Sequence, residues 1–259
     1  MHIVEIEDEM PESTDQTRYS LKQRTERIAG RWKQDREENA QKDEQQDGEE
    51  DLPSFELHVV STNRGEQAAM ITAAKEIWPW VHYIHIREKQ LSLHDRMNWA
   101  KWMADSGVPA SRIVINGANP FSSSDFYQGV HWSQDMLQKQ NKTLVSEMNN
   151  DRQMRWGVSV HSIDEARNAE EYGVDYLFFG HVYASTSKPD LTARGLEALA
   201  EVCSGVKIPV IAIGGIQPGN IQAVQSAGAS GAAVISGVLG QKDPAHAAIL
   251  LQQAVRAET

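Results

Sequence analysis

The residues most suited to chemistry follow the segment YLFFGHV, residues 176–182, which has the apolar character of a buried strand. His181 comes directly after Gly180, and the polar run Ser185, Thr186, Ser187 and Lys188 follows. A histidine titrates near neutral pH, so it can both accept and donate a proton. A structural histidine in the core is the competing interpretation. His181 is therefore a candidate for proton transfer beside a polar loop.

A second group of residues suits the binding of an anion. The segment AIGGIQPGNIQ contains Gly214 and Gly215, and VISGV contains Ser236 and Gly237. Glycine lets the backbone approach a ligand closely, and free N–H groups at helix N-termini hold anions. Either pair alone could simply form a tight turn. The occurrence of both after consecutive strands favours a phosphate site.

The segment HYIHIREK, residues 82–89, carries the third group. Alternation along a strand puts His85, Arg87 and Lys89 on one face and the intervening isoleucines on the other. Inward-facing cations are unfavourable unless an anion meets them, so an anion-binding role is expected. His82 and His85 would lie on opposite faces, which argues against a shared zinc ion.

Three further histidines are expected to have structural rather than catalytic roles. His161 precedes Ser162, a predicted helix N-cap that Glu165 would complete as a capping box. His58 and His131 have no evident partners in the sequence and are expected to be packed or at the surface.

Short β-like runs alternate with helical patterns from Phe55 onward, as in parallel βα repetition. An open doubly wound sheet is possible, but eight units of this length favour a closed (β/α)₈ barrel, a TIM barrel of the α/β class. Active sites of such barrels lie at the carboxyl ends of the strands, where Lys89, Asn116, Ser133 and Ser159 are also expected. The predicted strands are residues 55–61, 83–89, 112–117, 129–133, 155–160, 176–182, 209–215 and 231–237.

Charge divides the chain of 259 residues, because residues 1–53 carry 16 acidic and 8 basic side chains, or −8 of the net −11. We expect this segment to be a disordered or partly helical tail, and residues 54–259 to form the barrel. The negative charge argues against nucleic-acid binding, and no apolar run could span a membrane. A single cysteine and the lack of a signal-like start predict a cytoplasmic protein, and the sequence is compatible with a homo-oligomer.

From Phe55 to about Ala257 the sequence resembles the superfamily of thiamine phosphate synthases and thiazole tautomerases. The motifs that carry the resemblance are HIREK, VING, GVSVHS, DYLFFGHVY…K, IPVIAIGGI and GAAVISG. Synthases of this superfamily use Mg²⁺ held by carboxylates after strands three and four. This chain has Gly117 and Met136 at those positions and only Asp135 nearby, which is a poor replacement.

The Gly180–His181 pair stands where synthases have Gly-Pro, and it resembles the thiazole tautomerases (the TenI group), in which this histidine is catalytic. The resemblance implies isomerisation of a 2-carboxythiazolylidene ethyl phosphate to its aromatic carboxythiazole isomer, without a metal or redox cofactor. His181 would be the acid/base, and Arg87 and Lys89 would meet the carboxylate or balance charge. The other implied binding residues for the phosphate are Gly215, Ile235 and Ser236. Those lining the pocket are Asn116, Ser159 and Lys188, together with His85 on the second strand. A thiamine phosphate synthase and a non-catalytic regulator that binds thiazole or thiamine phosphates remain as alternatives.

Overall fold

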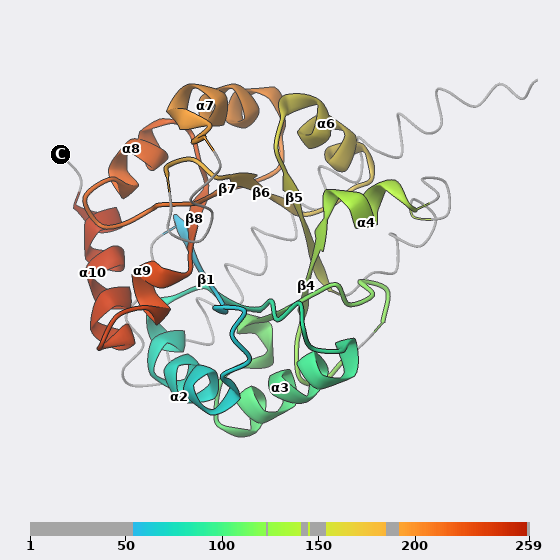
Figure 1. The fold of residues 1–259 in the computed structure, drawn as a ribbon. Coiled ribbons are helices and arrows are strands. Elements are labelled where there is room, and N and C mark those ends of the chain that lie inside the picture. Colours follow the sequence, from blue (N-terminus) through green and yellow to red (C-terminus); the bar gives the residue numbers. More distant parts are fainter. Residues whose placement is uncertain (1–53, 123, 141–144, 146–153, 185–191, 258–259) are drawn as a thin grey trace, which may run out of the picture. The chain divides into compact units, whose positions relative to one another are not determined.

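The structure, a computed structural model, describes residues 54–122, 124–140, 145, 154–184 and 192–257. Its eight strands pair in parallel in chain order, and the first pairs with the last to close a barrel (Figure 1). The predicted (β/α)₈ barrel is therefore confirmed. The strands are Glu56–Val60 (β1), Tyr83–Ile86 (β2), Ile113–Asn116 (β3), Gly129–Ser133 (β4), Arg155–Val160 (β5), Tyr176–Gly180 (β6), Val210–Ile213 (β7) and Gly231–Val234 (β8).

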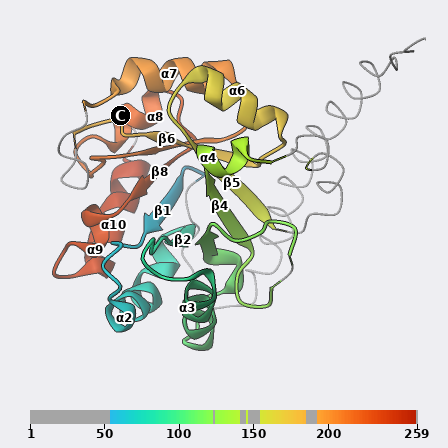
Figure 2. The same ribbon diagram turned by 45° about the vertical axis from the view of Figure 1, so that its right-hand side comes forward.

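Helices surround the strands in both ribbon views (Figures 1 and 2). In its described part, the connection from β3 to β4 contains no helix, which is the main departure from regular βα repetition. The α-helices are Gln67–Ile77 (α2), Leu93–Asp105 (α3), Gln134–Gln138 (α4), Ile163–Glu171 (α6), Gly195–Gly205 (α7), Ile221–Ser226 (α8), Ser236–Leu239 (α9) and Pro244–Arg256 (α10), with 3₁₀ turns at Trp78–Trp80 (η2) and Ala110–Arg112 (η3).

Alternation along the strands produces two cores. Outward side chains such as Ile84 and Ile86 are fully buried between the sheet and the helices. A smaller core inside the barrel consists of Val60, Tyr176, Phe178, Ile211 and Ala233. Burying both faces of a parallel sheet requires this double layer of apolar contacts.

The predicted helix start at Ser162 is found in α6. The Ser162 hydroxyl accepts from the Glu165 N–H at 3.2 Å. The Glu165 carboxylate reaches the N–H of His161 at 2.7 Å rather than that of Ser162, so the reciprocal bond is displaced by one residue. His161 itself is exposed at this helix end, and its Nδ1 lies 3.2 Å from Glu165 Oε2.

No helix in the described ranges is long and apolar enough to cross a membrane. Residues 1–53, which we predicted to form an acidic tail, lie outside the described residues.

Candidate active site

His181 lies directly beyond β6, with 7% of its surface exposed. Its Nε2 is 2.8 Å from the carbonyl oxygen of Thr192. A carbonyl can only accept a hydrogen bond, so Nε2 carries the proton and Nδ1 of the neutral ring carries the lone pair. Among the described residues no group hydrogen-bonds to Nδ1. The ring is thus fixed by one nitrogen and can accept a proton on the other.

Close packing of β6 against β7 sets the position of His181. Beyond the end of β6, the N–H of Val182 still donates to Ile213 O at 2.9 Å, and that of Tyr183 to Gly214 O at 3.0 Å. Gly214 has φ +107°, and a Cβ there would come within 2.5 Å of the Cβ of His181. A side chain at Gly214 would therefore displace the histidine.

Residues 192–195 hold the other side of this turn. The N–H of Arg194 donates to His181 O at 3.0 Å, and Arg194 Nε donates to Gly180 O at 2.9 Å. Because the same segment supplies the Thr192 carbonyl, it orients the imidazole as well as the backbone of His181.

The two predicted phosphate loops lie against each other. A Cβ on Gly237, at the start of α9, would be 3.3 Å from the Ile216 carbonyl in the loop after β7. Ser236 is exposed and Ile235 is half-buried. The first N–H groups of a helix have no partner within it, so α9 offers donors at this point. Gly215 has φ +67°, and a Cβ on it would meet Ala184 O at 2.5 Å. Packing is therefore sufficient to require glycine at this position, whether or not the loop binds an anion.

The cations after β2 differ in their surroundings. Strand β2 ends at Ile86, so the prediction that it extends to Lys89 was wrong, and alternation does not orient Arg87 and Lys89. Arg87 is half-buried, and burial lowers its pKa, partly offset by Glu88. Lys89 is exposed, and its N–H donates to Asn63 Oδ1 at 2.7 Å.

Glu88, which the sequence reasoning missed, is buried between these two cations. Its carboxylate accepts from the N–H groups of Asn63 at 2.9 Å and Gly65 at 2.8 Å. It thereby fastens the loop after β1 to the end of β2. The only signal for this role in the sequence is the position of one acidic residue between two basic ones.

Gly117 and Met136, which the resemblance matches to metal-binding carboxylates of synthases, lie side by side. A Cβ on Gly117 would be 3.9 Å from Met136 Cε and 3.3 Å from Arg96 Nη1. Arg96 Nη1 also donates to the carbonyl oxygen of Asn116, and burial lowers the pKa of Arg96. Glycine, methionine and a guanidinium do not fit a hard divalent cation, which prefers oxygen ligands. Across the described ranges, no three His, Cys, Asp or Glu residues form a group that could hold a metal ion.

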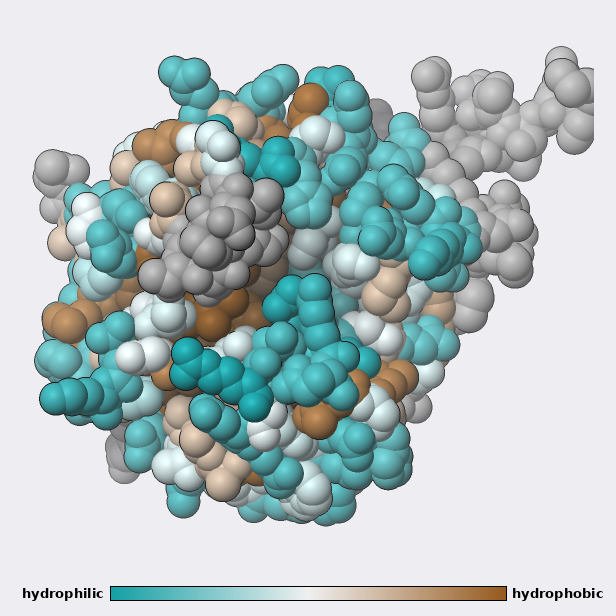
Figure 3. All heavy atoms as spheres, in the orientation of Figure 1, coloured by the Kyte–Doolittle hydropathy of each residue, from teal (hydrophilic) through white to brown (hydrophobic). Residues whose placement is uncertain are grey.

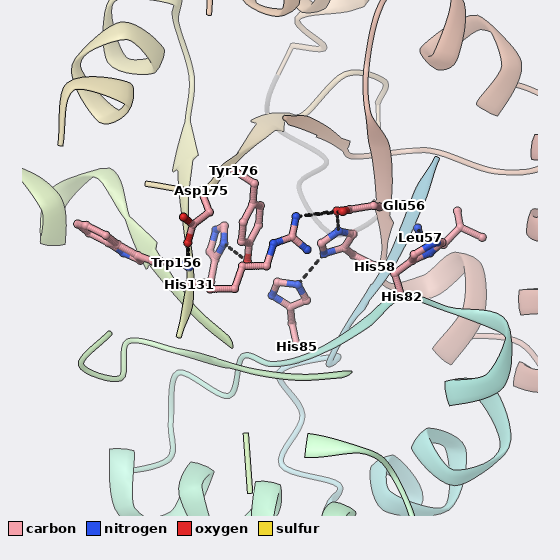
Figure 4. Close-up of polar contacts among 10 residues, drawn as sticks. Glu56, Leu57, His58, His82, His85, His131, Trp156, Asp175 and Tyr176 are labelled. Carbon is pink, nitrogen blue, oxygen red and sulfur yellow. Dashed lines mark hydrogen bonds and ion pairs between the residues drawn. The ribbon is translucent and has the colours of Figure 1, made fainter. Parts of the chain in front are cut away.

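Polar side chains also fill the barrel interior (Figure 4). His131 Nε2 lies 2.8 Å from Ser159 Oγ, and its Nδ1 lies 3.1 Å from the Tyr176 hydroxyl. Burial lowers the pKa of His131 to about 3, so its ring is neutral at physiological pH. The predicted binding residue Ser159 is thus anchored to His131, which is packed, as one of our two expectations had it.

The second interior group contains His85, which is fully buried inside the barrel rather than at its mouth. His85 Nε2 lies 2.9 Å from His58 Nδ1, and His58 Nε2 lies 3.0 Å from Glu56 Oε2. Glu56 in turn forms an ion pair of 2.8 Å with Arg155. His82 Nδ1 accepts from the N–H of Leu57 at 2.9 Å. This contact agrees with the expectation that His82 and His85 lie on opposite faces of the strand.

In the view down the barrel, hydrophobic residues are visible near the centre of the described surface, with strongly hydrophilic residues beside them (Figure 3). The strand ends on this scaffold bring together His181, Asn116, Ser159 and the loops at Gly215 and Ser236 around one end of the barrel. Lys188, predicted to line the pocket, lies outside the described residues.

The closed barrel places this protein among the (β/α)₈ barrels, and its polar groups and glycine-rich loops lie at the strand ends, where such barrels carry their active sites. Residues 57–238 match the family described as thiamine monophosphate synthase, and the chain belongs to this family. Its members are enzymes of thiamine biosynthesis.

Individual relatives agree with this assignment. The chain is 32% identical over 210 residues to a thiamine-phosphate synthase of Moorella thermoacetica, covering 79% of this chain and 97% of the relative. It is 34% identical over 214 residues to that of Albidiferax ferrireducens, covering 80% and 94%. The structure is similar to a thiamine phosphate pyrophosphorylase from Pyrococcus furiosus, with a TM-score of 0.61, 25% identity and coverage of 78% and 96%.

Proposed function

We propose that this protein is a thiazole tautomerase of the thiamine biosynthetic family. The reaction isomerises 2-(2-carboxy-4-methylthiazol-5(2H)-ylidene)ethyl phosphate to the aromatic carboxythiazole phosphate. The observation that carries the proposal is His181, whose Nε2 is engaged by the Thr192 carbonyl while Nδ1 keeps its lone pair. A neutral imidazole held in this way suits the removal of a proton from carbon.

The proposed reaction needs one proton to move between two carbon atoms. His181 Nδ1 takes the proton from ring C2, and the bonding electrons shift through the ring toward the exocyclic carbon. The imidazolium then returns a proton to that carbon, which leaves the ring aromatic and His181 neutral. The Thr192 carbonyl supports the transient imidazolium by accepting from its Nε2–H throughout.

The remaining residues would bind the two anionic groups of the substrate. We assign the phosphate to the backbone near Gly215, Ile235 and Ser236, because the two loops lie against each other and the first N–H groups of α9 have no partner within that helix. We assign the carboxylate to Arg87 and Lys89. Arg87 is the stronger candidate, because a half-buried cation gains most from meeting an anion.

A second candidate function is thiamine phosphate synthesis, which the names of the relatives favour. Against it stand Gly117 and Met136, where Arg96 lies close to the backbone. The two functions differ in chemistry, since the synthase joins a pyrimidine diphosphate to a thiazole phosphate and depends on Mg²⁺.

One experiment separates the two candidates. The purified protein is incubated with the dihydrothiazole isomer, and its conversion is followed by absorbance or NMR with and without EDTA. The tautomerase converts it equally in both conditions. Absence of conversion, together with Mg²⁺-dependent formation of thiamine phosphate from the two synthase substrates, would establish the second candidate instead.

A further inference from the structure

A line of buried polar side chains runs through the barrel interior from the start of β1 to the end of β3. Glu56, His58 and His85 are connected by hydrogen bonds of 3.0 and 2.9 Å (Figure 4). Asn116 continues the line, because it lies two residues beyond Val114, the register partner of His85, and therefore on the same face of β3. The line therefore links the floor of the barrel to a residue of the proposed binding site.

Glu56 sets the direction of the first hydrogen bond. The Arg155 guanidinium contacts both oxygens of the Glu56 carboxylate, at 2.8 and 3.1 Å, and holds the pKa of Glu56 well below its usual range. An ionised carboxylate only accepts hydrogen bonds. The His58 nitrogen that faces it, Nε2, must therefore carry a proton.

The surroundings of His58 keep it neutral. The ring is fully buried, with the rings of Tyr83, Phe178 and Tyr176 at 4.9, 5.3 and 5.7 Å, and burial lowers its pKa despite the bond to Glu56. A neutral His58 protonated on Nε2 presents a lone pair on Nδ1. His85 must then donate to it from its own Nε2, which leaves the lone pair of His85 on Nδ1.

Two buried polar atoms at the end of this line lack a partner among the described residues. They are His85 Nδ1 and Asn116 Oδ1. Both are acceptors in the arrangement derived above, so they cannot bond to each other. A half-turn of the Asn116 amide exchanges its oxygen and nitrogen, and Nδ2–H then donates to His85 Nδ1. This single rotation satisfies the histidine and removes the oxygen from its buried position.

We propose that Glu56 and His58 are positioning residues that act through His85 to fix the amide of Asn116, with its nitrogen toward the barrel interior and its oxygen toward the substrate. The proposal relies on the proposed function only for the identity of the ligand. Asn116 then presents an acceptor, which suits an uncharged ring or an N–H or O–H donor and repels an anion. The carboxylate and phosphate of the ligand are thereby directed away from Asn116, toward Arg87 and Ser236.

The first test is nitrogen NMR of the ¹⁵N-labelled full chain at neutral pH, which reports the protonation of each ring nitrogen. His58→Gln and His85→Gln spectra assign the two rings. We expect both histidines to carry the proton on Nε2 and a lone pair on Nδ1. A proton on His85 Nδ1, in either a neutral or a cationic ring, overturns the proposal. This result does not depend on whether the protein is a tautomerase.

The second test is Asn116→Asp, which keeps the shape of the side chain and removes its N–H donor. Both oxygens of the new carboxylate can only accept, so the lone pair of His85 would face a negative charge. We expect His85 to take up a proton on Nδ1 at neutral pH in the folded variant. An unchanged His85 spectrum would mean that Asn116 does not donate to it, and would overturn the proposal.

The third test measures binding of the aromatic carboxythiazole phosphate by titration calorimetry. His58→Leu breaks the line, and we expect its dissociation constant to rise about 3- to 10-fold, the usual worth of one neutral hydrogen bond. His58→Gln, which can still accept from His85, should recover most of the affinity. His161→Gln is the control for a histidine outside the line. Equal affinities in the wild type, His58→Gln and His58→Leu would contradict a positioning role.

Discussion

Replacing His181 by asparagine tests the proposed proton transfer most directly. Asparagine is polar and of similar size, but it cannot exchange a proton near pH 7. We expect kcat to fall by about 10²- to 10⁴-fold, the usual contribution of a positioned acid/base. This corresponds to roughly 3–5.5 kcal/mol of activation free energy. KM should change little, because the anion contacts are assigned to other strands.

The structure also bounds the effect of this substitution on stability. The His181 side chain makes one hydrogen bond to a described residue, from Nε2 to the Thr192 carbonyl. Its loss lowers the free energy of unfolding by about 1 kcal/mol, which a folded enzyme tolerates. If thermal melting shows that the variant is folded, the expected fall in kcat therefore reports a loss of proton transfer rather than unfolding.

The assay follows the absorbance change on aromatisation under saturating substrate. His161→Asn is the matched control, since that exposed ring lies at the start of α6 and contacts only Glu165 in the described structure. It should alter melting more than kcat. A His181→Asn enzyme that keeps more than about a tenth of wild-type kcat would refute the acid/base role, and the carboxylate of the substrate would become the better candidate base.

Four further predictions follow from the charges, the loops and the chain ends. The folded-state pKa values of His58, His85 and His131 are lowered, so their contribution to stability is complete above the unfolded value of about 6.5 and is lost as the pH falls below it. The melting temperature should therefore drop steadily from pH 7 to pH 4, and a flat profile would mean that these rings are already charged in the fold. Activity should not respond to EDTA or Mg²⁺, because Gly117 and Met136 offer no carboxylate, and a loss on chelation restored by Mg²⁺ would favour the synthase. Ser236→Asp should raise KM at least about tenfold by placing an anion where the phosphate is expected, whereas Ser236→Ala should change it little; equal effects of the two would remove the phosphate assignment. A protein beginning near Leu52 should fold and remain active, and its aggregation would contradict our interpretation of residues 1–53 as an appended tail.

The sequence predicted the barrel well because its signal is local and repeated. Each predicted strand overlaps a strand of the structure, and alternation placed Ile84 and His85 on opposite faces correctly. The end of β2 was predicted three residues too late, because Arg87 and Lys89 continue the every-second-residue pattern of His85 although the backbone has left the sheet after Ile86.

Interactions inside the barrel could not be predicted in the same way. His58 and His85 are 27 residues apart, and His131 and Tyr176 are 45 residues apart. Which inward side chains meet depends on the stagger between strands, and no local pattern encodes that stagger. The Thr192 carbonyl that orients His181 was missed for a related reason, because a backbone group has no signature in the sequence.

The hydrogen bond of Arg96 to the Asn116 carbonyl, beside Gly117, limits how a metal site could be engineered into this protein. A single Gly117→Asp change would not create a metal ligand, because its Cβ would lie 3.3 Å from Arg96 Nη1 and the new carboxylate would form an ion pair with that guanidinium. The φ of +83° at this position would also strain the new side chain. Building a metal site here would therefore require changes at Gly117, Met136 and Arg96 together, with no gain in metal binding expected from the first alone.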